Sequence, residues 1–282
     1  MNIGFIGAGK VGFSLGKYLS CNKVKVEGYY SRTFRSAYEA AIFTNSKAYN
    51  NLEELVNNSD TIFITTSDDS ICDIWQNIKN FNIKGKIICH TSGAESSKIF
   101  LDINNSGAFG YSIHPMFPFS DKFKTYMYLK DAYFSIEGSS EYLNYLCSFF
   151  EEMGNKVVKI DGSKKSLYHL ANVAVSNFVL SLISLGCNYL EECGVDSKES
   201  ISALMPLISS NIKNIGKKGF VNSLTGSVER ADLGTIKKHI ECIPSKDVHL
   251  YKILSMRLLE LSKVKNTGRN YDHIKAFLEG IE

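Results

Sequence analysis

The 282-residue sequence lacks the marks of disulfide, zinc and nucleic-acid-binding proteins. Its seven cysteines are an odd number and include no C-x-x-C pair, which argues against a disulfide framework or a zinc site and suits a reducing compartment. The formal net charge is only +3, and no basic run is longer than a pair such as Lys217-Lys218. We therefore expect a cytoplasmic protein without a bound metal, whose partners are neither nucleic acids nor membrane surfaces.

The sequence also shows neither a long apolar run nor the pattern of a leader segment. No uninterrupted apolar run approaches the ~20 residues that span a bilayer. The first residues already have the pattern of a strand, so we expect no signal peptide. A hydrophobic content of 44% and a charged content of 22% are typical of a globular protein. The length predicts one large domain or two ordinary ones of ~100–200 residues each.

The opening segment carries the most informative motif. A short buried strand is expected at Asn2–Ile6, and G-x-G-x-x-G follows at once, before a stretch with helical spacing. In such a turn the glycines permit a tight bend, a close backbone approach to a pyrophosphate and close helix packing, while the helix N-terminus attracts the anion. The alternative is a glycine-rich turn that holds no ligand. The predicted cofactor-binding residues here are Gly7, Ala8, Gly9, Lys10, Val11 and Gly12.

The residues after the second expected strand, at 24–30, indicate which nucleotide binds. A free ribose 2′-hydroxyl is usually held by an acidic residue at this point, and the sequence has none. Ser31 and Arg32 stand there instead, and a planar guanidinium beside hydroxyl donors suits a 2′-phosphate. NADPH is therefore the predicted cofactor. In the alternative interpretation, Arg32 and Arg35 are solvated charges at the start of a helix.

Strand and helix patterns alternate up to residue 160, after which only helical periodicity remains. This pattern predicts an α/β fold, a Rossmann-type doubly wound and mostly parallel sheet of about eight strands, followed by an all-helical C-terminal domain. The expected domains are residues 1–161, which bind NADP, and 162–282, for substrate and dimerisation. Further strands are expected at Lys47–Tyr49, 60–65, 86–90, 108–114, 132–137 and 156–160, and C-terminal helices at 165–190, 198–216, 232–241, 245–262 and 271–278.

The carboxyl ends of the later strands supply polar residues to the ligand edge of the sheet. Thr66 and Ser67 are expected near the cofactor ribose, and Asp68 or Asp69 as the cap of a helix at 71–78. Two successive strands end in a histidine, and both ends are expected to face the nicotinamide half. A structural role is favoured for His90, whereas His114 suits a structural role or a place in the substrate pocket. The predicted cofactor contacts of this edge are Thr66, Ser67, Thr91 and Ser92.

The expected helix at 165–190 is apolar almost all round, which is typical of a buried helix. Lys165, His169, Asn172 and Ser176 nevertheless fall within an arc of roughly 60° on it, and Asn177 lies on the flank of that stripe. The stripe either forms a hydrogen-bond network with another domain or subunit, or holds a carbonyl substrate. In the second interpretation His169 stabilises the oxyanion and supplies a proton, and Asn177 orients the substrate.

Tyr168 and the segment Ser223–Asp232 carry further candidate residues. Tyr168 lies off the stripe and is expected to pack, with a phenol able to reach the pocket. In the segment Ser223–Asp232, a Thr-Gly turn leads to Asp232, an expected helix cap. Arg230 suits either a bidentate contact with a substrate carboxylate or a salt bridge within its own loop. The predicted substrate-binding residues are His114, Asn172, Ser176, Thr225 and Arg230.

Taken in order, these motifs resemble a Rossmann-like family with a C-terminal helical domain of formerly unknown function, related to deazaflavin-dependent NADP reductases and β-hydroxyacid dehydrogenases. The resemblance covers essentially the whole chain. It rests on G-A-G-K-V-G, Tyr30-Ser31-Arg32, Ser67-Asp68-Asp69-Ser70-Ile71, His90-Thr91-Ser92-Gly93, Ile113-His114-Pro115, Leu167-Tyr168-His169 with Ser176-Asn177-Phe178, and Leu224-Thr225-Gly226 with Arg230 and Asp232.

The resemblance implies an NADPH-dependent reductase of a small 2-oxoacid. PanG-type ketopantoate reductases of this family convert 2-dehydropantoate to pantoate for pantothenate and coenzyme A synthesis. The alternatives are reduction of another small oxoacid or an imine such as pyrroline-5-carboxylate, or NADPH sensing without catalysis. The apolar helical half favours a homodimer.

The sequence departs from the family at a few positions. Ser227 replaces the usual proline of Thr-Gly-Pro, and Glu229 and Ala231 replace the usual alanine and glycine of Ala-Arg-Gly-Asp. Asn172 stands where a small apolar residue is usual. The lysine–glutamate pair of ordinary ketopantoate reductases is not evident in the sequence, so His169 is the predicted proton donor.

Overall fold

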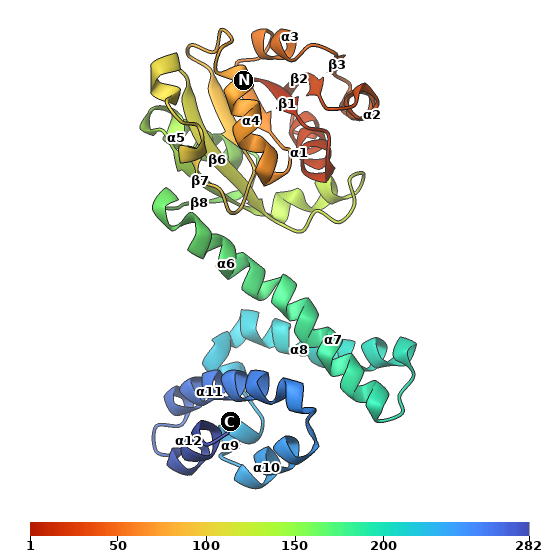
Figure 1. Ribbon diagram of the computed structural model, residues 1–282, viewed down its shortest axis with the longest axis vertical. Coiled ribbons are helices and arrows are strands. Elements are labelled where there is room, and N and C mark those ends of the chain that lie inside the picture. Colours follow the sequence, from red (N-terminus) through yellow and green to blue (C-terminus); the bar gives the residue numbers. More distant parts are fainter. Residues whose placement is uncertain (282) are drawn as a thin grey trace. The chain divides into compact units, whose positions relative to one another are not determined.

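A computed structural model describes residues 1–281 of the chain, which divide into two compact units, Met1–Val179 and Leu180–Glu282. The first unit is built on an eight-stranded sheet with the order β3-β2-β1-β4-β5-β6-β7-β8 (Figure 1). All neighbouring strands are parallel except β6 and β7. The strands are β1 (Asn2–Ile6), β2 (Lys25–Tyr30), β3 (Lys47–Tyr49), β4 (Thr61–Ile64), β5 (Ile87–His90), β6 (Phe109–Met116), β7 (Tyr133–Gly138) and β8 (Lys156–Lys159).

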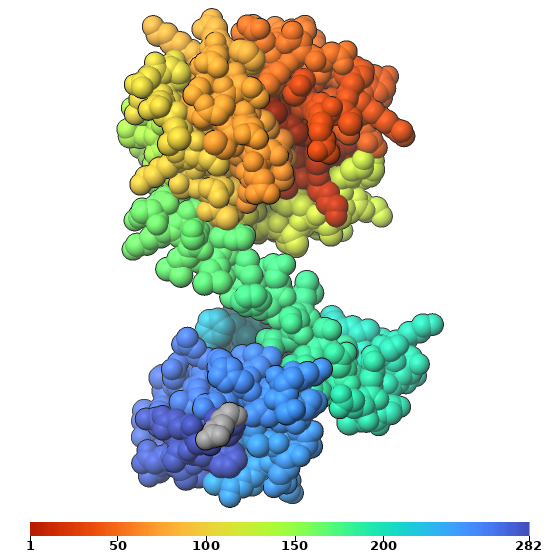
Figure 2. All heavy atoms as spheres, in the orientation of Figure 1, coloured from red at the N-terminus to blue at the C-terminus, as the bar shows by residue number. Residues whose placement is uncertain are grey.

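Helices cover both faces of this sheet, and each face has its own apolar core. Along a strand, successive side chains point to opposite faces. Phe63 of β4 therefore joins the core beneath α1, α2 and α5, while Ile62 and Ile64 join the core beneath α3 and α4. In Figure 2 the first part of the chain, coloured red to yellow, forms one packed body. The helices are α1 (Lys10–Cys21), α2 (Phe34–Thr44), α3 (Leu52–Asn57), α4 (Asp68–Ile78) and α5 (Ser140–Glu152).

This architecture confirms the predicted fold class, a Rossmann-like sheet followed by helices. The order β3-β2-β1-β4 turns around at β1, so β2 and β4 lie on either side of the strand that ends in the glycine-rich turn. In open sheets of this kind, ligands bind beyond the carboxyl ends of the strands where the order reverses. One local expectation was wrong. Ser67 is the N-cap of α4, and Asp68 and Asp69 lie in its first turn.

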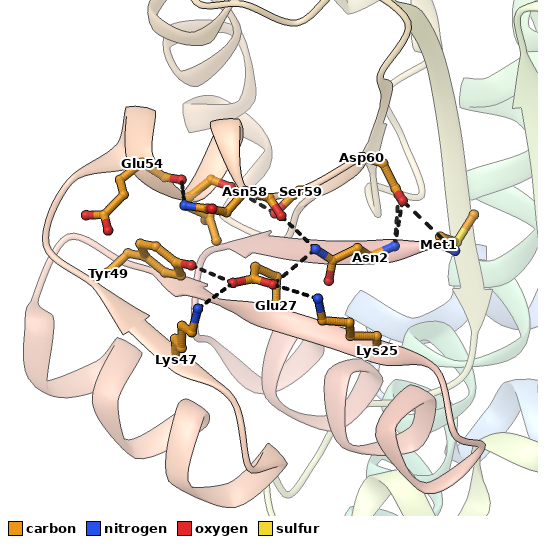
Figure 3. A network of polar contacts seen from close by, with 11 residues as sticks. Met1, Asn2, Lys25, Glu27, Lys47, Tyr49, Glu54, Asn58, Ser59 and Asp60 are labelled. Carbon is orange, nitrogen blue, oxygen red and sulfur yellow. Dashed lines mark hydrogen bonds and ion pairs between the residues drawn. The ribbon is translucent and has the colours of Figure 1, made fainter.

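A buried carboxylate ties β1, β2 and β3 together at the end of the sheet remote from the glycine-rich turn. Glu27 accepts hydrogen bonds from Tyr49 (2.7 Å) and Asn2 (3.0 Å) and pairs with Lys25 (3.3 Å) and Lys47 (3.2 Å), as Figure 3 shows. Only 6% of its side chain is exposed. Burial raises the pKa of Glu27, but these hydrogen bonds outweigh burial and lower it to about 2.

The helix expected at 165–190 differs from the prediction in continuity and in burial. It consists of α6 (Lys165–Val175) and α7 (Asn177–Glu192), which are separated at Ser176, where φ is −115° and ψ is −76°. Lys165 is buried, but the expectation of a buried helix was wrong. Leu167 and Val175 are 66% and 75% exposed, because only the first turns of α6 pack on the sheet.

The expected absence of a membrane-spanning apolar run concerns uninterrupted runs, but one segment reaches that length by its average composition. Residues 162–192, which include α6 and α7, are long and apolar enough to cross a bilayer by length and composition, and none of the most apolar eighteen-residue stretch is buried. A single segment of this kind is weak evidence for a membrane span, because helices of soluble proteins pass the same test. The beginning of the segment is bound to the sheet through the side chains of Lys165 and Tyr168.

Within the described residues, all regular secondary structure of the second unit is helical. Its small core gathers six side chains: Val228, Ile236, Leu259, Tyr271, Ile274 and Leu278. The long helix α8 has a non-helical residue, Gly219, with φ 75° and ψ 174°. Besides most of α7, the helices are α8 (Ser197–Ser223), α9 (Ser227–Arg230), α10 (Leu233–Cys242), α11 (Val248–Lys265) and α12 (Asp272–Glu279).

Candidate active site

A cavity of about 500 Å³ lies at the carboxyl ends of β1, β2 and β4. Seven of the predicted cofactor-binding residues line it: Gly7, Ala8, Gly9, Ser31, Arg32, Thr66 and Ser67. Thr33, whose hydroxyl was expected to join Ser31 as a donor to the 2′-phosphate, lines it as well. The cavity also takes in residues for which no cofactor contact was predicted, namely Ile6, Tyr30, Ser36, Leu52, Thr65, Ser70, Ile74 and Asn77. Leu52 and Ile74 add an apolar lining, which suits the flat face of a base.

The glycines of the turn are required by the space around them. Gly7 has φ +107°, and a methyl group on Gly12 would lie 2.3 Å from Oγ1 of Thr65 and 2.5 Å from the carbonyl oxygen of Gly7. Gly9, by contrast, has nothing nearer than 4.0 Å around the position of a Cβ atom. Gly7 and Gly12 therefore serve the turn and its packing, while Gly9 leaves room for a ligand at the N-terminus of α1. These residues fit a dinucleotide pyrophosphate.

The remaining predicted cofactor residues do not line the cavity. Lys10 and Val11 form the first turn of α1, beside the turn that does. Thr91 and Ser92 follow β5 and are buried, with 9% and 6% exposed. The Ser92 hydroxyl accepts hydrogen bonds from the backbone of Ala94 and Glu95, so this side chain shapes the loop after β5.

Beside this cavity, polar side chains gather on one face of β5, β6 and β7. His90 is paired in register with Ser112, and His114 with Ser135. Residues two apart on a strand share a face, so these side chains and that of Glu137 all point away from the core under α1, α2 and α5. Ile64 of β4 is the register partner of His90 and directly precedes Thr65, which lines the nucleotide cavity, so this polar group begins one strand away from that cavity.

The first turns of α6 cover these polar side chains. Lys165 is only 2% exposed, and its Nζ donates a hydrogen bond to Oγ of Ser112 at 2.7 Å. Burial lowers the pKa of Lys165 to about 8, although the carboxylates of Glu137 and Asp68 act in the opposite direction. Its ammonium group also lies 5.1 Å from the ring centre of Tyr168.

One turn along α6, Tyr168 contacts His114, and His169 lies beside the Cβ position of residue 93. Nδ1 of His114 and the hydroxyl of Tyr168 are 2.7 Å apart in a hydrogen bond. Burial, together with the smaller effects of Lys165, His169 and His90, lowers the pKa of His114 to about 3. A methyl group on Gly93 would lie 2.8 Å from Cδ2 of His169 and 3.0 Å from Nε2 of His114. The loop after β5 can approach both imidazoles this closely only because residue 93 is glycine.

The contacts of His90 fit the structural role favoured for it. The side chain is fully buried, its ring centre lies 5.4 Å from that of Phe100, and its Nδ1 accepts a hydrogen bond from the Ser92 backbone. Burial lowers its pKa to about 4. Among residues 1–281, no group of three or more His, Cys, Asp or Glu residues is placed to hold a metal ion.

The expected polar stripe of α6 is divided by these contacts. Lys165 and His169 reach the polar face of the sheet, whereas the other members bond within their own segment. The amide of Asn172 donates to the carbonyl of Tyr168, and the Ser176 hydroxyl bonds to the Asn172 carbonyl and to the Asn177 side chain. Asn177 and Ser176 are exposed.

The predicted residues Thr225 and Arg230 belong to the second unit. Arg230 pairs with Asp232 at 3.9 Å, as one of its two interpretations requires, and its side chain is 59% exposed. The neighbouring Glu229 accepts a hydrogen bond from Asn266 at 2.8 Å and pairs with Lys265 at 3.8 Å. Asp232 caps α10, as expected, by accepting from the Thr235 backbone.

Sequence reasoning missed the roles of Ser112, Tyr168 and Gly93 at this site, and placed Lys165 in the stripe without a function. Ser112 was detectable, since it lies two residues before His114 and shares its face. The contact between Tyr168 and His114 spans 54 residues and has no local signal.

Comparisons with known proteins agree with the two-part architecture. Residues 1–115 match the model of a Rossmann-like domain, and residues 132–258 match that of a domain of unknown function, DUF2520. No curated protein matches the chain. Among solved structures, protein TM1727 from Thermotoga maritima is 27% identical with a TM-score of 0.74, and the match covers 94% of this chain and 99% of the other.

Two more distant structures share the fold. A candidate NADP oxidoreductase from Bacteroides fragilis, BF3122, is 23% identical with a TM-score of 0.74 over 92% of this chain and 98% of its own. Pyrroline carboxylate reductase from Plasmodium falciparum, solved with NADP bound, is 14% identical with a TM-score of 0.63 over 95% and 98%. The chain is thus similar to a Rossmann-like domain in its N-terminal part and to the DUF2520 domain over residues 132–258, which include β7, α5 and β8 and much of the helical part.

Proposed function

We propose that this protein is an NADPH-dependent reductase of a small 2-oxoacid, with 2-dehydropantoate as the first substrate to test. The observation that carries the proposal is the group formed by the buried Lys165 and the half-buried His114 and His169, on the same edge of the sheet as the nucleotide cavity. It brings one ammonium and two imidazoles to the edge of the sheet where the strands end. Positive charge suits a substrate that is an anion and a transition state in which an oxygen becomes negative.

Each residue has a distinct task in this proposal. A bound nicotinamide would supply hydride to the carbonyl carbon. The Lys165 ammonium stabilises negative charge, and His169, which is half-buried beside Gly93, donates the proton. The low pKa of His114 makes it a neutral hydrogen-bonding group that orients the substrate. Ser31 and Arg32, in the nucleotide cavity, hold the 2′-phosphate.

Imine reduction is the second candidate. The fold match to a pyrroline carboxylate reductase favours it. The charge of the site opposes it, because an imine is reduced most readily as a cation, and Lys165 would repel that cation. A cyclic imino acid would still offer its carboxylate to the same group of residues.

Steady-state rates with NADPH and a substrate panel test the proposal. The panel contains 2-dehydropantoate, other short 2-oxoacids and pyrroline-5-carboxylate. Turnover of 2-oxoacids well above that of the imine is the expected result. Turnover of the imine alone would favour the second candidate, and NADPH binding without turnover of any compound would point to a sensing role.

We also infer that the chain forms a homodimer. Several large apolar side chains of α7 and α8 in the second unit are exposed, among them Leu180 (68%), Phe220 (66%) and Ile212 (61%). Apolar surface of this extent usually marks an interface. Light scattering coupled to gel filtration should give twice the chain mass, and a monomer at micromolar concentration would contradict the inference.

A further inference from the structure

We propose that Tyr168 is a positioning residue that fixes the tautomer of His114. Its hydroxyl donates to Nδ1, so that Nε2 carries the hydrogen and presents an N–H donor beside Gly93 and His169. The tautomer itself is independent of the proposed reaction. The use of that N–H to hold a substrate oxygen rests on the proposed function.

The geometry of the pair is that of a defined contact. The two rings meet edge to face, with centres 5.7 Å apart and planes at 87°, and the N···O distance is 2.7 Å. His114 lies on β6 and Tyr168 on the second turn of α6. Lys165, one turn earlier, is anchored to Ser112 of the same strand. These two hydrogen bonds from α6 to β6 thus fix the position of the Tyr168 phenol relative to the His114 imidazole.

The direction of the bond follows from the chemistry of its two ends. A phenol is a stronger hydrogen-bond donor than a neutral imidazole N–H, and an imidazole nitrogen is a stronger acceptor than a phenol oxygen. The 2.7 Å separation is typical of an O–H donor and short for an N–H donor. In the competing arrangement Nδ1–H donates to Tyr168, and the Tyr168 hydroxyl must then donate to another acceptor, Ser135. The buried Oγ of Ser135 has no hydrogen-bond partner among the described residues, so this second hydrogen bond is not formed.

Burial keeps His114 neutral, so that only one of its nitrogens carries hydrogen. Its pKa is lowered to about 3 by desolvation and by the nearby Lys165, His169 and His90. A Cβ atom at residue 93 would lie 3.0 Å from Nε2, so the glycine there leaves this nitrogen uncovered on that side. A neutral imidazole with its hydrogen on Nε2 can donate to a carbonyl or carboxylate oxygen without giving up a proton. Such a group orients a ligand and leaves proton donation to its neighbours.

The chain contains a matched pair that serves as an internal control. In the second unit, Nδ1 of His239 lies 3.0 Å from the hydroxyl of Tyr251, with ring centres 5.8 Å apart and planes at 81°. This pair is nearly identical in geometry and is not part of the proposed site. Tyr168→Phe and Tyr251→Phe each remove one phenol hydroxyl from a histidine and leave the ring in place.

Long-range ¹H–¹⁵N spectra of the ¹⁵N-histidine-labelled full chain at neutral pH test the proposal, with His114→Asn to assign the signals. In the wild type, Nδ1 of His114 should be unprotonated and Nε2 protonated. In Tyr168→Phe the two tautomers should interconvert and the signals should average, while Tyr251→Phe should leave the His114 signals unchanged.

Protonated Nδ1 in the wild type would overturn the proposal, and this result requires no variant to fold. An unchanged His114 tautomer in Tyr168→Phe would also overturn it. These spectra separate the proposal from the reaction, because a protein that turns over no 2-oxoacid still reports its tautomer. If 2-oxoacids are substrates, Tyr168→Phe should raise KM about tenfold with a smaller change in kcat, since orientation is weakened while the proton donor remains. An unchanged KM would show that His114 does not contact the substrate.

Discussion

The Nζ atom of Lys165 lies 2.7 Å from Oγ of Ser112, and the lysine is only 2% exposed. The pKa of this ammonium is about 8, because burial disfavours its charge. Its charge is therefore present at neutral pH and is lost as the pH rises through about 8.

The first prediction concerns the alkaline side of the pH–rate profile. If the charge of Lys165 stabilises the reacting oxygen, the kcat/KM of the wild type should fall as this charge is lost above pH 8. Lys165→Arg keeps a charge that does not titrate in this range, so the ratio of its kcat/KM to that of the wild type should be constant below pH 8 and rise about tenfold per pH unit well above it. Steady-state rates between pH 6 and 10 measure both. A wild-type profile that stays level to pH 10 would contradict the prediction.

Gly93→Ala is expected to impair the site without unfolding the protein. The new methyl group would lie 2.8 Å from His169 and 3.0 Å from His114, so that the rings or the loop must shift by a few tenths of an ångström. We expect kcat/KM to fall ~10–100-fold, with unchanged NADPH affinity and melting temperature. Gly216→Ala is the control, because its methyl group meets nothing within 4 Å. Equal losses of activity in both variants would remove Gly93 from the site.

These predictions combine what the sequence indicates with what only the structure provides. Strands such as β4, which is parallel to its neighbours and buried on both faces, are nearly continuous apolar runs and were predictable for that reason. The other strands were predicted as well, with their ends within two residues of those observed. The glycine-rich turn and Arg32 were predictable because each spacing has a direct physical use. The break at Ser176 was not, since neither proline nor glycine signals it. The exposure of α6 could not be predicted from the sequence either, because periodicity shows which side chains are apolar but not which part of the protein covers them.

The network around Glu27 should make stability depend on acid. The pKa of Glu27 is about 2 in the folded chain against an ordinary 4.5, so its contribution is complete above pH 4.5 and is lost as the pH falls toward 2. The shift corresponds to about 3 kcal/mol at most. Urea unfolding at pH 6, 4 and 3 should show the wild type losing its advantage over Glu27→Gln as the pH falls. Glu39→Gln, which removes an exposed pair with Lys122, should change stability by less than ~1 kcal/mol. A constant difference between wild type and Glu27→Gln from pH 6 to 3 would contradict this role of Glu27.

Ala231→Gly should stabilise the protein. Ala231 adopts φ 60° and ψ 35°, a left-handed conformation that is unfavourable for a residue with a Cβ atom. This accounts for the glycine that the resembling family has at the same position. Glycine should raise the free energy of unfolding by ~0.5–1 kcal/mol in urea titrations. Ala276→Gly, inside α12, is the opposite control and should lower it by about 1 kcal/mol. Destabilisation by Ala231→Gly would show that the methyl group of Ala231 contributes more than its strain costs.

Arg32 should discriminate NADPH from NADH. It lines the nucleotide cavity with Ser31 and Thr33, whereas Arg35, three residues further on, is exposed and does not line it. Arg32→Ala removes a charge expected to meet the 2′-phosphate, so the Kd for NADPH should rise ~10–100-fold and that for NADH should change less than twofold. Arg35→Ala removes an equal charge and should leave both values nearly unchanged, which excludes a general loss of positive field. Fluorescence titration of both nucleotides against the three proteins measures this. Equal weakening of NADPH and NADH by Arg32→Ala would place the guanidinium away from the 2′-phosphate, and equal effects of the two variants would mean that neither arginine makes a specific contact.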